Sequence, residues 1–157
     1  MVERVPITPQ GIEKLKQELA RLKEERPKIS REIGVAREHG DLSENAEYHA
    51  AKERQGMVEA QIKDLEDKIS RSEVIDPAKL SGDKVRFGAT VTLSNLDTDE
   101  EVTYQLVGAD EADIDAGTIS ISAPLARAMI GKSVGDELNV VLPAGARNYE
   151  ILEIVFK

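Results

Sequence analysis

The chain has no cysteine and no tryptophan, and only 3% of its 157 residues are aromatic. The absence of cysteine excludes a disulfide scaffold, a thiolate metal site and a cysteine nucleophile. The longest stretch without a charged side chain, residues 116–126, is about half as long as the ~20 apolar residues of a membrane-spanning helix, and it contains Ser, Thr and Pro. These absences predict a protein without a transmembrane segment.

Acidic side chains outnumber basic ones by 30 to 21, which gives a formal net charge of −9. The excess is uneven, since residues 1–75 carry a net charge of −2 and residues 76–157 a net charge of −7. An acidic surface argues against a protein that reads DNA sequence. The hydrophobic fraction of 40% is too high for a disordered chain, and the first residues lack the basic-then-apolar order of a secretory signal. We therefore expect a folded cytoplasmic protein.

Two segments of the first half carry apolar residues at alternating spacings of three and four, a pattern typical of coiled coils. The first series is Ile12, Leu15, Leu19, Leu22, Arg26, Ile29, Ile33 and Ala36, and the second is Tyr48, Ala51, Gln55, Val58, Ile62, Leu65 and Ile69. Only a short break at residues 39–42 separates them, and a connection this short requires antiparallel neighbours. Residues 1–75 are therefore predicted to form an antiparallel coiled-coil hairpin.

Local signals indicate where the first helix begins and ends. Thr8 followed by Pro9 is a favourable pair of N-cap and first helical residue, and Gly40 lies where glycine often follows a helix. Pro27 removes one backbone donor inside this helix. Because the heptad pattern continues through it, Pro27 is expected to bend the helix without ending it.

The second half has the alternation of strands, with apolar residues at every other position of 85–93 and 102–106 around a turn-like segment, 95–99. Further strands are predicted at 118–122, 137–142 and 149–156, and a helix opened by Pro124 at 124–130. This pattern indicates an α+β domain with a small antiparallel sheet over residues 84–157. Residues 76–83, with Pro and Gly, are predicted to be a hinge.

The expected tip of the hairpin carries the strongest chemical signal. Asp41 and Glu44 have the spacing of a capping box, in which Asp41 would cap the second helix. The same two carboxylates could instead hold a hard cation such as Mg²⁺, whose near-octahedral oxygen shell a partner would have to complete. The two interpretations are compatible.

Both histidines of the chain, His39 and His49, also lie near this tip, but ten residues apart and without cysteine they make a poor zinc site. Arg37, Lys52 and Arg54 place positive charge in the same region. Such side chains serve either a solvated ion-pairing surface or contacts with RNA phosphates, which need no aromatic stacking platform.

Several stretches together resemble the GreA family of bacterial transcript cleavage factors. The resemblance rests on the tip motif at residues 36–51 and on residues 87–91, 110–113 and 126–132. It extends over nearly the whole chain. It implies an N-terminal coiled coil and a C-terminal domain similar to the FK506-binding protein fold.

The resemblance also implies a function. The chain would enter the secondary channel of RNA polymerase and stimulate the polymerase's own cleavage of backtracked RNA 3′ ends, acting as a cofactor of that active site and not as an enzyme. Asp41 and Glu44 would help hold a Mg²⁺ ion shared with the polymerase, and Arg37 and Lys52 would contact the RNA 3′ segment. Ser122, Ala123 and Pro124 would dock on the polymerase, although Ala123 stands where the family commonly has Ser. We expect a monomer without membrane association.

Three other functions are weighed against this one. An inhibitor that blocks the channel would not need both tip carboxylates, and a coiled-coil adaptor would not need the charged tip. A prolyl isomerase needs a deep aromatic pocket. The second half offers only four aromatic residues, Phe87, Tyr104, Tyr149 and Phe156, which more simply belong to its core.

Overall fold

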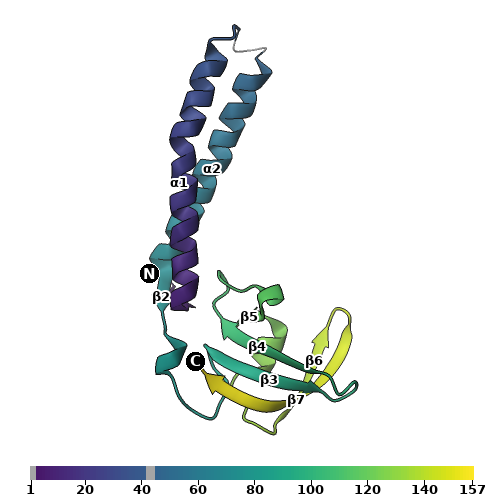
Figure 1. Ribbon diagram of the computed structural model, residues 1–157. Helices are drawn as coiled ribbons and strands as arrows, with labels where there is room; N and C mark the ends of the chain where they lie inside the picture. The colour runs from purple at the N-terminus through teal and green to yellow at the C-terminus, as the bar shows by residue number, and fades with distance from the viewer. Residues whose placement is uncertain (1–2, 42–44) are drawn as a thin grey trace. The chain divides into compact units, whose positions relative to one another are not determined.

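The computed structural model describes residues 3–41 and 45–157, and its contacts divide the chain into two compact units. One unit is Glu13–Arg71, and the other combines the first twelve residues with Ser72–Lys157. Figure 1 shows two long helices in the first unit and a curled sheet in the second. Within the described residues, no helix combines the length and the apolar character needed to cross a membrane. The predicted α+β class is confirmed.

The two long helices are α1, Pro9–Arg37, and α2, Ala46–Arg71. They lie side by side, and contacts between Arg26 and Glu59 and between Glu32 and Arg54 require that they run antiparallel. The predicted hairpin is therefore confirmed. Its apolar seam follows the two heptad series, with six buried side chains at its centre: Leu22, Ile29, Ile33, Ala51, Val58 and Ile62.

Both ends of α1 follow the expected signals. Thr8 is buried, and its hydroxyl accepts a hydrogen bond from the Gly11 amide at 3.0 Å, which is the predicted N-cap contact. The helix continues through Pro27 without interruption. It ends at Arg37, and Gly40 follows with a φ of 120°, a conformation that side chains rarely adopt.

The second unit contains a five-stranded sheet with the order β5-β4-β3-β7-β6. Neighbouring strands are antiparallel except β4 and β5, which pair in parallel, so one strand departs from the predicted antiparallel pattern. Helix α3, Pro124–Met129, packs Leu125, Ala126 and Met129 into the core of this sheet. The strands are β3 Ala89–Asn95, β4 Glu101–Val107, β5 Thr118–Ser120, β6 Glu137–Leu142 and β7 Gly145–Phe156.

The first strand of this sheet begins later than residue 85, where the alternation begins. Val85 is buried, but its backbone bonds to Lys132 and Gly131 instead of to a neighbouring strand. Gly88 then turns the chain with a φ of 87°, and β3 starts at the next residue. The alternation of apolar residues therefore predicted a strand at residues 85–88, where the backbone instead forms a loop and a turn.

Two short strands were not predicted from the sequence. β1, Val5–Ile7, and β2, Ser72–Val74, pair in parallel, and the Ile75 amide extends the pairing to the Ile7 carbonyl at 2.9 Å. After them, the short helix η1, Pro77–Lys79, is capped by the Asp76 side chain. The predicted hinge at 76–83 contains this turn and a buried Pro77, and its role as a hinge stays a prediction.

A single carboxylate joins the start of α1 to the loop after β4. Glu111 accepts hydrogen bonds from the Thr8 amide at 2.8 Å and the Gly108 amide at 2.9 Å, and also from the Thr8 hydroxyl. The fit is close, because a Cβ at Gly11 would overlap the Glu111 side chain and a Cβ at Gly108 would overlap the Pro6 carbonyl oxygen. Residues 103 positions apart in the sequence are thus held in contact.

We predict that Gly108→Ala destabilises the full chain by about 1–3 kcal/mol, because the obstructing Pro6 oxygen belongs to the backbone and cannot rotate away. Denaturant unfolding would measure this loss. Gly34→Ala is the control, since a Cβ there meets nothing within 4 Å, and alanine favours a helix interior by up to about 1 kcal/mol. Equal stability of Gly108→Ala and the unmodified chain would contradict the close fit.

Candidate functional site

The tip of the hairpin is the candidate functional site. Asp41 is exposed there, and it lines an open depression of about 430 Å³ together with His39, Asn45, Ala46 and Glu47. Glu44 lies outside the described residues, so the joint geometry of the two carboxylates stays a prediction. The structure thus places one of the two acidic residues at an accessible position beyond the end of α1.

Asp41 does not cap α2, which corrects the capping-box interpretation. The helix begins at Ala46, and Asn45 is its cap: the Asn45 Oδ1 accepts from the Tyr48 amide at 3.0 Å, and its backbone carbonyl accepts from the His49 amide at 3.1 Å. Asp41 precedes this cap by four residues, too early in the chain for the role. The spacing Asp-x-x-Glu resembles a capping box, but the residue that caps α2 is Asn45, which is also of a preferred cap type.

The two predicted RNA-contacting residues lie on different elements near the tip. The Arg37 guanidinium, in the last turn of α1, lies 5.9 Å from the centre of the Tyr48 ring. Lys52, on α2, donates from its Nζ to the Gln55 Oε1 at 3.3 Å. Both side chains are exposed, so their charges are accessible to a polyanion.

One histidine makes a contact across the tip, and the other makes a contact within α2. The His39 Nδ1 lies 3.6 Å from a Glu47 carboxylate oxygen, and the His49 ring meets the Tyr48 ring edge-on at 5.6 Å. Within the described part of the chain, no group of three or more histidine and carboxylate side chains is placed to hold a metal ion.

A groove of about 710 Å³ runs between the helices next to the tip. Its apolar lining is made of small residues and one valine: Val35, Ala36, Ala50 and Ala51. Its charged lining includes Lys28, Arg31 and Arg54. Because alanine side chains fill little space, the two helices lack large interlocking side chains in this region.

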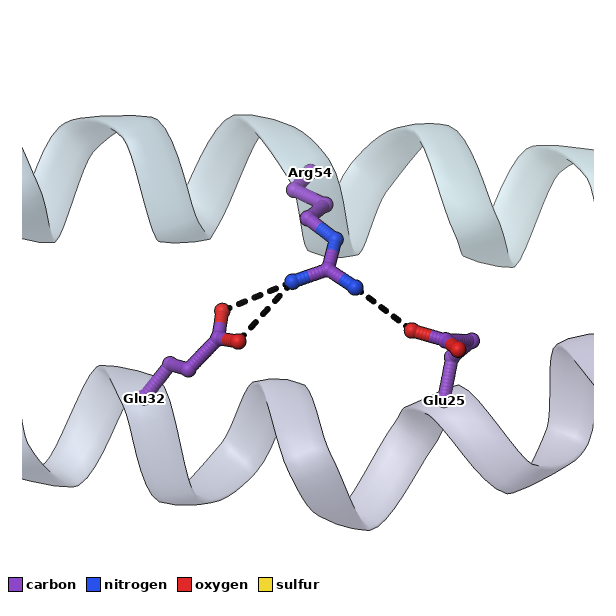
Figure 2. Close-up of polar contacts among 3 residues, drawn as sticks. All are labelled: Glu25, Glu32 and Arg54. Atoms are coloured by element: carbon purple, nitrogen blue, oxygen red, sulfur yellow. Dashed lines mark hydrogen bonds and ion pairs between the residues drawn. The ribbon is translucent and has the colours of Figure 1, made fainter.

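Arg54 connects the two helices beside this groove (Figure 2). Its Nη1 donates to both carboxylate oxygens of Glu32 at 2.9 Å, and its Nη2 donates to Glu25. The hydrogen bond to Glu32 is the main cause of the raised pKa of Arg54. One cation on α2 thus meets two carboxylates that lie seven residues apart on α1, which fixes the register of the helices at this point.

A second ion pair replaces an apolar contact in the seam. Arg26 interrupts the heptad series of α1, and it donates to both carboxylate oxygens of Glu59, with distances of 2.7 and 2.8 Å. The hydrogen bond from Arg26 holds the pKa of Glu59 below its ordinary value. The position where the apolar pattern fails is therefore occupied by a bidentate contact between the helices.

The predicted docking residues are the last two residues of the loop after β5 and the first residue of α3. Ser122 and Pro124 are exposed, and the Ser122 hydroxyl lies 2.7 Å from that of Ser120. Ala123 occupies the N-cap position of α3 and makes no side-chain capping bond. It is half-buried and packs against the sheet core, which explains why a small apolar residue is accommodated there.

Two features of the site were missed in the sequence. Asn45 could have been found as a cap, because asparagine directly before a helical segment is a strong N-cap signal. The bridging role of Arg54 had no such signal, since Glu25 and Glu32 lie 29 and 22 residues away. Their meeting depends on how the two helices are paired.

Comparisons with known proteins match both halves of the chain. A family model described as transcription elongation factor, N-terminal, matches residues 5–74, and one described as transcription elongation factor, GreA/GreB, C-term, matches residues 80–156. The chain is 56% identical over 157 residues to the transcription elongation factor GreA of Hyphomonas neptunium, covering 99% of this chain and 100% of the relative. It is 59% identical over 155 residues to the GreA of Rhizobium leguminosarum bv. trifolii, covering 98% of each chain.

Solved structures show likeness at lower identity. The GreA factor homolog 1 protein of Thermus thermophilus is 30% identical with a TM-score of 0.45, covering 97% of this chain and 99% of that one. The prokaryotic transcription elongation factor GreA/GreB from Nitrosomonas europaea is 23% identical with a TM-score of 0.43, covering 98% and 100%.

We predict that Arg54→Ala lowers the melting temperature of the hairpin modestly, and that added salt reduces the difference, because exposed ion pairs are screened. Far-ultraviolet circular dichroism at low and high salt would measure both effects. Arg21→Ala is the matched control, because Arg21 forms its ion pair with Glu18 on its own helix. An equal loss for both variants would show that the bridge between helices adds nothing.

We predict a pH dependence for the Arg26 and Glu59 pair. The pKa of Glu59 is lowered in the folded state, so the pair stabilises the hairpin above the ordinary value of 4.5, and this contribution is lost as the pH falls through the folded pKa. Glu59→Gln should therefore melt below the unmodified chain at neutral pH, and the two melting temperatures should converge in acid. A gap that stays constant with pH would refute the assignment.

Proposed function

Because the chain belongs to the GreA/GreB family of transcription elongation factors, we propose that it stimulates the cleavage of backtracked RNA by bacterial RNA polymerase. In this proposal the hairpin enters the secondary channel of the polymerase and brings its tip to the active site. The polymerase is the enzyme, and this chain supplies side chains to it. Release of the blocked RNA 3′ end then allows an arrested complex to resume elongation.

The observation that carries the proposal is the exposed carboxylate of Asp41 beyond two long paired helices. Helices of 29 and 26 residues extend about 40 Å at ~1.5 Å per residue, enough to reach a site deep within a larger protein. The seam and the ion pairs between the helices hold them as one rod. Such a rod carries a charged group through a narrow passage without collapsing.

The two tip carboxylates are ligands of the type that Mg²⁺ prefers, but they are too few to complete its coordination shell. Asp41 and Glu44 offer carboxylate oxygens, the ligands that Mg²⁺ prefers. Since two carboxylates supply only part of an octahedral shell, we propose that the ion is shared with the polymerase and is not held stably by the free chain. When bound, Mg²⁺ lowers the pKa of a coordinated water and stabilises negative charge at a phosphate.

The chain's own residues would orient this chemistry. Asp41 and Glu44 would hold the ion in place near the RNA phosphate to be cleaved. Arg37 and Lys52 would contact phosphates of the displaced 3′ segment as point charges, which needs no base recognition. The ring of Tyr48 beneath the Arg37 guanidinium supports this role, because it holds an accessible cation at the end of α1.

Docking is assigned to the loop before α3. Ser122 and Pro124 are exposed there, while the half-buried Ala123 keeps the loop against the sheet core. Contact of this loop with the polymerase would raise the local concentration of the tip at the channel.

We predict that Asp41→Asn and Glu44→Gln each reduce cleavage of RNA in stalled, backtracked polymerase complexes at limiting Mg²⁺ by at least about tenfold, because each removes a charged ligand. The Asp41 variant leaves the α2 cap intact, since Asn45 provides it. Gel analysis of the labelled RNA measures cleavage, and competition with the unmodified chain measures binding.

Glu53→Gln is the control, because it removes the same charge from an exposed position on α2. Unchanged cleavage by both tip variants would refute the metal role. Reduced elongation without any cleavage by the unmodified chain would indicate an inhibitor instead.

A further inference from the structure

Asn45 makes contacts with both helices at the tip. Its Oδ1 caps α2 at the Tyr48 amide, while its Nδ2 donates to the Ala36 carbonyl in the last turn of α1. The Ala36 carbonyl also accepts from the His39 amide at 3.1 Å. One half-buried side chain therefore joins the final turn of one helix to the first turn of the next.

We infer that Asn45 is a positioning residue, which fixes the separation of the two chain segments that carry the tip carboxylates. This inference rests on the proposed function. Asp41 follows the end of α1 held at Ala36, and Glu44 immediately precedes Asn45 in the sequence. If the helix ends move apart, Asp41 is no longer held at a fixed distance from the start of α2.

The chemistry requires an amide side chain. Capping needs an acceptor, and the bond to the carbonyl needs a donor; the asparagine side chain supplies both on one planar group. Aspartate caps equally well but is acceptor-only when ionised, and serine caps through a shorter side chain with one hydroxyl. Capping alone therefore leaves open several residue types, whereas capping and bridging together select asparagine.

The packing near the tip makes this bridge important. Ala36 and Ala51 end the buried seam, and the groove of about 710 Å³ opens beside them, so few apolar contacts hold the helices together there. Two further contacts cross the tip: the Arg37 guanidinium lies 5.9 Å from the centre of the Tyr48 ring, and the exposed side chains of His39 and Glu47 lie 3.6 Å apart. An exposed pair such as His39 and Glu47 contributes little to the stability of the hairpin. The Asn45 side chain is instead half-buried, and it bonds to backbone groups at the ends of both helices.

The test separates bridging from capping with Asn45→Asp and Asn45→Ser, both of which retain a side-chain acceptor for the Tyr48 amide. The chain has no native cysteine, so spin labels can be attached at Glu38→Cys and Glu53→Cys in the full-length protein. The distance distribution between these labels reports the geometry of the tip without any polymerase. Cleavage of backtracked RNA is then measured over a range of protein concentrations.

Both variants should broaden the distribution of distances between the labels. They should also lower the cleavage rate at saturating protein concentration by at least about tenfold, because small misplacements of reacting groups reduce the rate strongly. The concentration for half-maximal cleavage should stay within about twofold, because docking is untouched. Asn139→Asp is the matched control: it removes the donor of the bond between Asn139 and Asn148 at 2.9 Å in the C-terminal sheet, and should change neither reading.

Asn45→Asp adds a negative charge and Asn45→Ser does not, so an effect that both variants share is not caused by the charge. Narrow, unchanged distances in both variants would overturn the bridge, and broadened distances with normal saturating cleavage would overturn its positioning role. If the unmodified chain stimulates no cleavage, the proposed function fails together with the positioning role. In that case the distances still decide whether Asn45 bridges the helices.

Discussion

The structure of the hairpin depends above all on the apolar seam between α1 and α2. Leu22, Ile29 and Ile33 pack against Ala51, Val58 and Ile62, and burial of these side chains holds two helices together that would be marginal alone. Because the seam follows heptads on both helices, it permits a small number of registers, and the short connection makes the pair antiparallel. Every feature of the tip depends on this pairing.

Polar contacts select the register that the seam allows. The two bridges, from Arg54 to Glu25 and Glu32 and from Arg26 to Glu59, require particular residues to face each other. Their side chains are exposed apart from the half-buried Glu25, so each bridge contributes modestly to stability. Their effect lies in specificity, since a shift of one turn would separate the guanidinium groups from the carboxylates. At the tip, Asn45 performs the same task between helix ends.

The base of α1 is held by contacts within the other unit. Glu111 accepts a hydrogen bond from the Thr8 amide, and β1 pairs with β2 just before the helix. The helix therefore begins among hydrogen bonds made by residues that are distant in the sequence. This half-buried carboxylate leaves little space for Gly11 and the Pro6 carbonyl leaves little for Gly108, so a methyl group at either glycine would overlap its surroundings. The first turn of the helix is thus defined by tertiary contacts as well as by its own cap.

The sequence by itself determined the two helices, their antiparallel pairing, the Thr8 cap and most strands, because these follow from local periodicity and from short connections. It also located Asp41 near an exposed tip. Only the tertiary structure decided that the Asn45 amide also reaches the Ala36 carbonyl, that Arg54 bonds to two carboxylates, and that Thr8 bonds to Glu111. Those contacts join residues that lie between 9 and 103 positions apart in the sequence, and each depends on how separate elements are paired. Local sequence patterns indicate which backbone conformation a segment prefers. The packing of helices and strands decides which side chains of different elements come into contact.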